Sequence, residues 1–170
     1  MRNLKPGDRV PDLQVQTLQG KFVLANRSPE HFTMLLFYRG IHCPLCKTQV
    51  EKLELRLEDF NDLGVEVLCL SVNSQKQAEQ TFEEWELEEI NLGYEVSLET
   101  GREWGLFISE AVKESEPEHF FEPALFLVRP DGTLYSAHIQ SIPFVRPDFD
   151  RLLRAIKFII KEEYPAKGKS

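Results

Sequence analysis

The sequence predicts an α/β fold in which helices pack around a mixed β-sheet. Two apolar runs without polar alternation, at 33–38 and 65–72, indicate central strands that are buried on both faces. Between them, Val50, Leu53, Leu57 and Phe60 recur three and four residues apart, which indicates an amphipathic helix over 46–63. Strand, helix, strand and helix, followed by a hairpin and a closing helix, describe helices packed around a mixed sheet.

The elements on either side of this unit are shorter. Alternation of apolar and polar residues over 13–23 indicates a β-hairpin at an edge of the sheet. Ser74 is expected to cap a second helix, which is followed by a short strand near 94–98 and a helical turn around 102–106. The polar, Glu-rich segment 109–121 is expected to be an exposed insertion.

The C-terminal elements are indicated by a turn and an apolar stripe. Arg129-Pro130-Asp131-Gly132 separates an apolar strand at 124–128 from a second strand at 133–139, which predicts a hairpin. Apolar residues at helical spacing then predict a final helix over 148–163. Since no repeat or linker is visible, we expect a single domain over residues 1–170.

Composition excludes several classes of partner. A net charge of −8 and a pI near 5.1 argue against nucleic acid or an anionic membrane. The acidic segment 79–99 is expected to be a solvated helix face, with a docking surface for a basic protein as the alternative. The polar start, Met1–Asp12, does not resemble a signal peptide, and no apolar run is long enough to span a bilayer. We therefore expect a cytoplasmic protein.

The most informative motif is Cys43-Pro44-Leu45-Cys46, which follows the first buried strand and opens the helix. Unpaired N–H groups and partial positive charge at a helix N-terminus stabilise a thiolate, and Pro44 suits the first helical turn. The motif therefore predicts a redox-active pair, Cys43 and Cys46. The alternatives are two inert thiols or part of a zinc site, for which only Cys69 and scattered histidines could complete the ligands, so we expect no metal.

Other candidate residues have weaker patterns. His42, beside Cys43, could lower the pKa of that thiol or shuttle a proton, or it could face solvent. Cys69 lies in an apolar strand and is expected to be a small buried hydrophobe. Because the chain has no glycine-rich phosphate loop, we expect no nucleotide or flavin cofactor. Electrons would then arrive by thiol exchange.

The motif and its setting resemble the redox turn of the thioredoxin fold. This resemblance implies a thioredoxin-like fold, with a central mixed sheet flanked by helices and an N-terminal β-hairpin. It also implies that Cys43 is the exposed nucleophile and Cys46 the resolving thiol. Glu122-Pro123, directly before the strand at 124–128, resembles the cis-proline of that fold and implies that Pro123 shapes the site for an incoming thiol.

From about residue 3 to about residue 163 the chain is similar to peroxiredoxin-like members of the alkyl hydroperoxide reductase/thiol-specific antioxidant (AhpC/TSA) group. The similarity lies in Gly7–Leu13, Phe37-Tyr38, Trp104-Gly105-Leu106 and Phe126–Gly132. It implies an antioxidant thiol-dependent oxidoreductase.

One part of the similarity concerns the peroxiredoxin loop P-x-x-x-T-x-x-C, whose cysteine attacks the peroxide. Aligned on this loop, Cys46 takes the attacking position, while Arg39 replaces the proline and Cys43 the threonine. Pro123 stands about where the family has an arginine. We therefore expect Arg39 or Arg146 to supply a replacement guanidinium.

Three functional hypotheses follow. The first is a thiol-disulfide oxidoreductase that cycles a Cys43/Cys46 dithiol and disulfide on protein disulfides. The second is a hydroperoxide reductase with Cys46 attacking and Cys43 resolving, reduced by a thiol donor of the thioredoxin or glutathione type. The third is a non-catalytic redox sensor or adaptor that binds a partner through the face at 79–99. Peroxiredoxins often dimerise, so the resemblance also suggests a homodimer.

Overall fold

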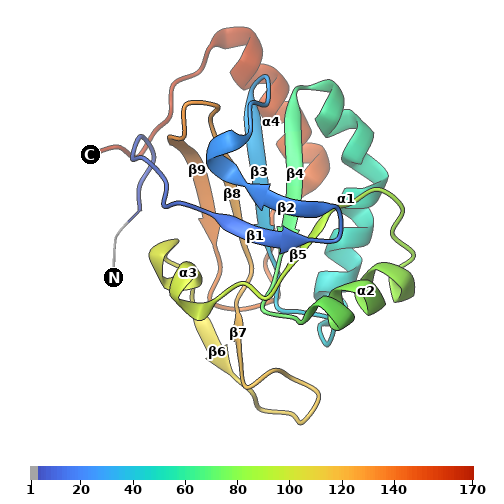
Figure 1. Ribbon diagram of the computed structural model, residues 1–170. Coiled ribbons are helices and arrows are strands. Elements are labelled where there is room, and N and C mark those ends of the chain that lie inside the picture. The colour runs from blue at the N-terminus through green and yellow to red at the C-terminus, as the bar shows by residue number, and fades with distance from the viewer. Residues whose placement is uncertain (1–3) are drawn as a thin grey trace.

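The computed structural model describes residues 4–170. Met1–Asn3, with which the predicted domain and the family-like segment begin, lie outside the described residues. Figure 1 shows a central sheet with helices packed against it and a small separate strand pair at one end. The seven-stranded sheet contains β1 (Gln14–Thr17), β2 (Gly20–Val23), β3 (Phe32–Phe37), β4 (Val65–Leu70), β5 (Leu92–Tyr94), β8 (Ala124–Val128) and β9 (Leu134–Ile139).

The separate pair and the helices complete the structure. The pair consists of β6 (Ile108–Glu110) and β7 (His119–Phe121). The helices are η1 (Leu24–Asn26, a 3₁₀ turn), α1 (Pro44–Asp62), α2 (Gln75–Glu84), α3 (Leu98–Glu103) and α4 (Phe149–Glu162). Within the described part of the chain, no helix has the length and apolarity needed to cross a bilayer.

The sheet is mixed, as predicted, with the strand order β2-β1-β5-β4-β3-β8-β9. Strand β3 lies near the middle, parallel to β4 and antiparallel to β8. Its residues alternate between two apolar clusters: Met34 and Leu36 belong to one, and Leu35 and Phe37 to the other. This double burial explains why the strand has no polar alternation, and it fixes the position of the turn that follows β3.

The two clusters occupy opposite faces of the sheet (Figure 1). Apolar side chains of α1 and α4, including Val50, Leu53 and Ile156, fill one of them. Side chains of the N-terminal hairpin and those next to α3, including Phe22 and Trp104, fill the other. Residues of α1 and α4 therefore lie side by side on one face, which brings the segment before α4 close to the start of α1.

Two short predicted elements after α2 lie earlier in the chain than expected. The strand expected at 94–98 ends at Tyr94, because Glu95 adopts a left-handed backbone conformation, with a φ of 53°. The helical turn expected at 102–106 is α3, which begins earlier because the Ser97 side chain accepts a hydrogen bond from the Thr100 N–H at 3.1 Å. The predicted cap of α2 is confirmed, since Ser74 and Gln77 form a capping box.

The segment 109–121 was predicted to be an exposed insertion, and this prediction was wrong for both ends of the segment. They form the antiparallel pair β6 and β7, and Phe120 and Phe121 are buried. Phe121 packs edge-on against Phe37 of β3, with ring centroids 5.8 Å apart. A three-residue strand is too short to show a period in the sequence, so its two aromatic residues were the only signal of burial.

Candidate functional site

The turn at residues 39–43 connects β3 to α1 and sets the position of both sulfurs. Gly40 has a φ of +135°, and a Cβ atom there would lie 2.8 Å from the Asn73 amide nitrogen. Asn73, almost fully buried beyond the end of β4, accepts a hydrogen bond from the Ile41 N–H at 2.8 Å. The turn is therefore held by a neighbouring loop, through a residue that the sequence analysis did not identify.

Cys43 is the N-cap of α1, with Pro44 as the first helical residue. Its Sγ atom accepts a hydrogen bond from the Cys46 backbone N–H at 3.2 Å. Both cysteines are free thiols in this structure. Cys43 was expected to be exposed, which was wrong: it is 1% exposed and Cys46 is 0% exposed, because both contribute to the apolar cluster beneath α1.

The two thiols have opposite pKa shifts. Hydrogen bonds from the Cys46 side chain and backbone, with the positive charge of Arg146, lower the pKa of Cys43 to about 6 despite its burial. Burial, followed by the interaction with Cys43, raises the pKa of Cys46. The pair therefore holds one thiolate near neutral pH, and its electrostatics favour Cys43 as the charged sulfur.

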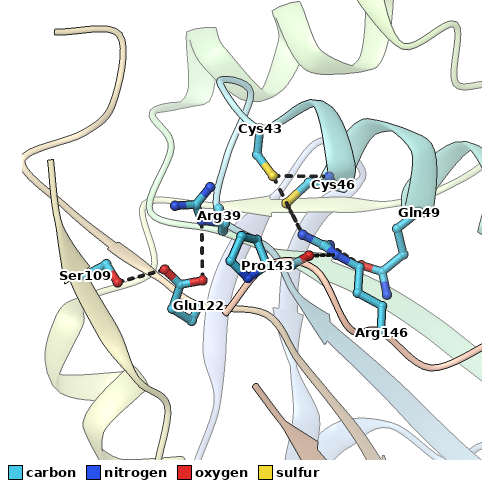
Figure 2. Close-up of polar contacts among 8 residues, drawn as sticks. All are labelled: Arg39, Cys43, Cys46, Gln49, Ser109, Glu122, Pro143 and Arg146. Carbon is cyan, nitrogen blue, oxygen red and sulfur yellow. Dashed lines mark hydrogen bonds and ion pairs between the residues drawn. The ribbon is translucent and has the colours of Figure 1, made fainter. Parts of the chain in front are cut away.

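Arg146 links these sulfurs to the segment before α4 (Figure 2). Its Nη2 atom lies 3.4 Å from the Sγ atom of Cys46 and 3.7 Å from that of Cys43. Its Nε atom donates to the Pro143 carbonyl at 2.6 Å, which fixes the direction of the guanidinium. Of the two arginines expected to replace the missing family arginine, Arg146 is the one in hydrogen-bond contact with both sulfurs.

Gln49 is a further residue of this cluster that the sequence analysis missed. Its Oε1 atom accepts a hydrogen bond from Arg146 Nη1 at 2.6 Å (Figure 2). The side chain is buried, and its Nε2 atom has no hydrogen-bond partner among the described residues. A polar residue three positions after Cys46 lies on the same helix face as that cysteine, and this spacing was the available signal.

Arg39 belongs to a second polar cluster beside the turn. Its Nε atom forms an ion pair of 3.4 Å with Glu122 Oε2, and the Ser109 hydroxyl donates to Glu122 Oε1 at 2.7 Å (Figure 2). The guanidinium also lies over the Phe120 ring, 4.7 Å from its centroid. Arg39 contributes to the lowered pKa of Cys43, after Cys46 and Arg146. The strand pair β6–β7 thus contacts the turn.

Pro123 differs from the expectation. Among residues 4–170 every peptide bond is trans, so the predicted cis bond before Pro123 was wrong. The chain runs extended here because both sides are paired: the Glu122 N–H donates to the Phe107 carbonyl, and the Pro123 carbonyl accepts from the Gln140 N–H. Pro123 is buried directly before β8, and the side chain that donates hydrogen bonds to both sulfurs, Arg146, comes from another segment.

His42 is half-buried and packs against Phe120, with ring centroids 4.9 Å apart. Burial, with the nearby charge of Arg39, lowers the pKa of its imidazole, which favours the neutral form. In the part of the chain that the structure describes, neither ring nitrogen has a hydrogen-bond partner. The structure therefore places the imidazole of His42 beside Arg39 and Phe120, and among the described residues it forms no hydrogen bond to the Cys43 sulfur.

Cys69 lies apart from this site. It is fully buried in β4, as predicted, and burial raises the pKa of its thiol. Across residues 4–170 no three His, Cys, Asp or Glu side chains are grouped as metal ligands. Two thiols, one guanidinium and one amide lie together at the start of α1.

Known proteins have sequences similar to this chain. A family model described as the AhpC/TSA family matches residues 6–137. A peroxiredoxin of Pyrococcus abyssi is 30% identical over 165 residues, which cover 89% of this chain and 69% of that protein. A 1-Cys peroxiredoxin of Medicago truncatula is 37% identical over 71 residues, which cover 42% of this chain and 33% of that protein.

Solved structures show the same fold. A cysteine-to-serine mutant of peroxiredoxin 6 from Arenicola marina gives a TM-score of 0.78 at 15% identity, over 95% of this chain and 76% of that one. AhpC of Mycobacterium bovis gives 0.76 at 14% identity, over 100% and 99% of the two chains. The predicted thioredoxin-like fold and the predicted class of enzyme, a thiol-dependent oxidoreductase, are confirmed. The chain belongs to the AhpC/TSA family.

Proposed function

We propose that the protein is a thiol-dependent hydroperoxide reductase in which Cys43 and Cys46 cycle between dithiol and disulfide. The observation that carries this proposal is the position of Arg146, whose Nη2 atom lies within 3.7 Å of both sulfurs. A guanidinium at this place can stabilise a thiolate and can donate to the oxygens of a peroxide as its O–O bond breaks. Membership of the AhpC/TSA family supports the same chemistry.

Burial of the sulfurs favours a small substrate. Attack on a protein disulfide requires an accessible thiolate, since the two sulfurs must approach in line with the disulfide bond. Cys43 and Cys46 are 1% and 0% exposed. A hydroperoxide group is much smaller than a protein disulfide, and the donors beside the sulfurs suit its oxygens. The structure thus supports hydroperoxide reduction, the activity of the second hypothesis, better than the reduction of protein disulfides.

The proposed cycle has two steps on the protein. A cysteine thiolate attacks the terminal oxygen of ROOH, so that an S–O bond forms, the O–O bond breaks, and RO⁻ leaves and takes a proton. The attacking cysteine is now a sulfenic acid. The thiol of the second cysteine attacks that sulfur, so that an S–S bond forms and water leaves. An external dithiol then returns two electrons by thiol exchange.

Two orders of attack are open to the pair. The lowered pKa of Cys43, about 6, favours this thiolate as the first nucleophile. The alternative begins at Cys46, which stands at the attacking position of the peroxiredoxin loop and lies nearer to Arg146, at 3.4 Å compared with 3.7 Å. In both orders the other cysteine resolves the sulfenic acid, and Arg146 contacts both sulfurs.

The remaining expectations belong to this proposal. The electron donor is a small thiol or a dithiol protein of the thioredoxin type, and a reducing compartment such as the cytoplasm would supply it. A homodimer is also proposed: β9 lies at the edge of the sheet, and its outer side, beyond the pairing of Leu134 with Gly7 and Asp8, has no backbone partner among residues 4–170. Light scattering after size-exclusion chromatography would test the dimer.

Hydroperoxide consumption by single-cysteine variants tests the function. With dithiothreitol as donor, we expect the wild type to consume hydrogen peroxide and cumene hydroperoxide and not to reduce insulin. If Cys43 attacks first, Cys43→Ser abolishes consumption, while Cys46→Ser retains it. Without dithiothreitol, Cys46→Ser should accumulate a sulfenic acid that dimedone traps at Cys43. The reverse pattern assigns the attack to Cys46. Efficient insulin reduction without peroxide consumption would contradict the proposal in favour of a disulfide reductase.

The sensor hypothesis predicts a different outcome. Turnover would be slow with every peroxide and disulfide, while oxidation of Cys43 and Cys46 would change the affinity of a partner for the acidic face at 79–99. Charge reversal on this face, by Glu83→Lys, would then weaken that binding without affecting the redox state of the cysteines.

A further inference from the structure

A surface groove of about 580 Å³ begins at the cysteine site and follows one side of α1. Gln49 and Arg146, which contact each other, line both the groove and the sulfur site. From there the groove continues past the next turns of α1, where its wall is formed by residues three or four positions apart. Its α1 lining consists of Leu45, Thr48, Gln49, Lys52, Leu55 and Arg56.

Much of this wall is exposed and apolar. Leu55 is 78% exposed, Phe144 is 74% exposed and Leu45 is 40% exposed. All three line the groove, and they come from two segments, α1 and the loop before α4. Large apolar side chains that gather at the edge of a site commonly mark a contact surface for an apolar ligand. Here they lie beside the residues that contact the sulfurs.

Apart from Arg146 at the sulfur site, one cation of the groove has no ionic partner among residues 4–170. Asp150 pairs with Arg56 at 2.7 Å, and Asp148 caps α4 by accepting a hydrogen bond from the Arg151 N–H at 2.8 Å. Lys52 lies between Gln49 and Leu55 on the same helix face, and it forms no ion pair with any residue of the range 4–170. The groove thus presents apolar side chains and one available ammonium group.

A buried donor at the head of the groove also lacks a partner. Gln49 is 5% exposed, and its Nε2 atom has no hydrogen-bond partner in the described residues. A buried unpaired amide is costly, and a ligand oxygen would satisfy it. Gln49 and Lys52 are three residues apart, so their backbones are separated by about 4.5 Å along the axis, and the lysine side chain extends further along the groove.

We infer that this groove binds the tail of an amphipathic organic hydroperoxide that carries a carboxylate, such as a fatty acid hydroperoxide. The peroxide oxygens lie against Gln49 and Arg146, the alkyl chain packs on Leu45, Leu55 and Phe144, and the carboxylate pairs with Lys52. This assignment rests on the proposed hydroperoxide reductase activity, and it makes the groove the determinant of substrate preference.

The test compares substrates that share a peroxide and differ in their tails. We expect linoleic acid hydroperoxide to have a higher kcat/KM than its methyl ester, and the ester a higher value than hydrogen peroxide. Lys52→Glu should lower kcat/KM for the acid, relative to hydrogen peroxide, about five- to tenfold, the size expected for a partly exposed ion pair turned into a repulsion. Leu55→Ser should lower kcat/KM for the acid and for the ester by the same factor, relative to kcat/KM for hydrogen peroxide.

Lys76→Glu is the matched control. It makes the same change of charge at an exposed position of α2, outside the groove, and should leave kcat/KM for the acid and for the ester, each relative to hydrogen peroxide, unchanged. If Lys52→Glu and Lys76→Glu lower kcat/KM for the acid, relative to hydrogen peroxide, by the same factor, the effect comes from net charge. The assignment of Lys52 to the carboxylate is then overturned. Equal kcat/KM for all three substrates in the wild type would overturn the proposal that the groove binds the substrate tail.

A binding measurement separates this inference from the proposed activity. Hydroxyoctadecadienoic acid, the reduced product, has the same tail and no peroxide. Isothermal titration should show that it binds the wild type and binds Lys52→Glu about five- to tenfold more weakly. The wild type could bind the hydroxy acid, and Lys52→Glu bind it more weakly, while no peroxide is turned over. This result would contradict the proposed function and support the groove as a binding site for the tail. No binding by the wild type, or equal binding by the wild type and Lys52→Glu, would overturn the proposal that the groove binds the tail through Lys52.

Discussion

Arg39 and Glu122 form a buried ion pair of 3.4 Å that joins the turn before α1 to the segment before β8. Their side chains are only 17% and 5% exposed. Ser109 and Phe120, both from the β6–β7 pair, support this contact through a hydrogen bond to the carboxylate and through a ring below the guanidinium. The conformation of the turn therefore depends on a strand pair that lies outside the main sheet.

Breaking this pair should destabilise the fold. Glu122→Gln removes the carboxylate and leaves the largely buried Arg39 charge without its partner, which should cost about 2 to 3 kcal/mol in the free energy of unfolding. Urea denaturation followed by tryptophan fluorescence measures it. The control is Glu66→Gln, which breaks the more exposed pair with Arg27 and should cost less than about 1 kcal/mol. Equal losses in the two variants would contradict the buried role of Glu122.

The sequence predicted those helices and strands that are long enough for the spacing of their apolar residues to form a pattern. Strand β3 and helix α1 were predicted because burial imposes a pattern over many residues. From these two elements followed the strand-to-helix junction, and with it the place of Cys43 at the cap of α1. The β6–β7 pair was missed because each strand has only three residues. A period cannot be established over so short a segment.

The contacts of the site depended on residues that are far apart in the chain. Nothing in the local sequence indicates that Arg146 reaches both sulfurs, that Asn73 holds the turn, or that Glu122 pairs with Arg39. The family pattern left two arginines, Arg39 and Arg146, as candidates for the missing guanidinium. Only the packing of α4 beside α1 showed that Arg146 is the one beside both sulfurs. The burial of Cys43 was also a tertiary effect, since its neighbours in sequence are partly exposed.

Removal of the Cys46 thiol should raise the pKa of Cys43. The hydrogen bond from the Cys46 side chain is the largest of the effects that lower this pKa to about 6. The thiolate fraction of Cys43, and thus its rate of alkylation by iodoacetamide, rises as the pH increases through the pKa. We expect a midpoint near pH 6 in the wild type, and a midpoint at higher pH in Cys46→Ala. Cys69→Ala should match the wild type. An unchanged midpoint in Cys46→Ala would show that other groups set this pKa.

Cys69 should remain unmodified while Cys43 reacts. Its thiol is fully buried in β4, and burial raises its pKa, so the thiolate is absent at neutral pH in the native state. Peptide mapping by mass spectrometry after brief alkylation at pH 7.5 should find the label at Cys43 and not at Cys69. In 6 M guanidinium chloride, where burial is lost, all three cysteines should be labelled. Labelling of Cys69 in the native protein would mean that β4 opens at low cost.

Arg146→Met should separate the role of the guanidinium from that of the helix start. The variant keeps the N-cap geometry of Cys43, which depends on the Cys46 N–H, and it removes the donor that lies 3.4 Å from Cys46 and 3.7 Å from Cys43. Since the charge of Arg146 lowers the pKa of both thiols, the midpoint of Cys43 alkylation should move to higher pH. The rate of hydroperoxide reduction should fall by more than this shift explains, by about 10²-fold, because a donor to the breaking O–O bond is also lost.

Two controls complete the Arg146 test. Arg154→Met changes the same charge on an exposed position of α4 and should leave both the midpoint and the rate unchanged. Arg146→Lys keeps the charge but loses the planar group that contacts Gln49 and both sulfurs, so it should restore the midpoint more than the rate. If the lysine restores both equally, the residue acts through its charge alone. The contact of one guanidinium with two sulfurs would then be unnecessary for the chemistry.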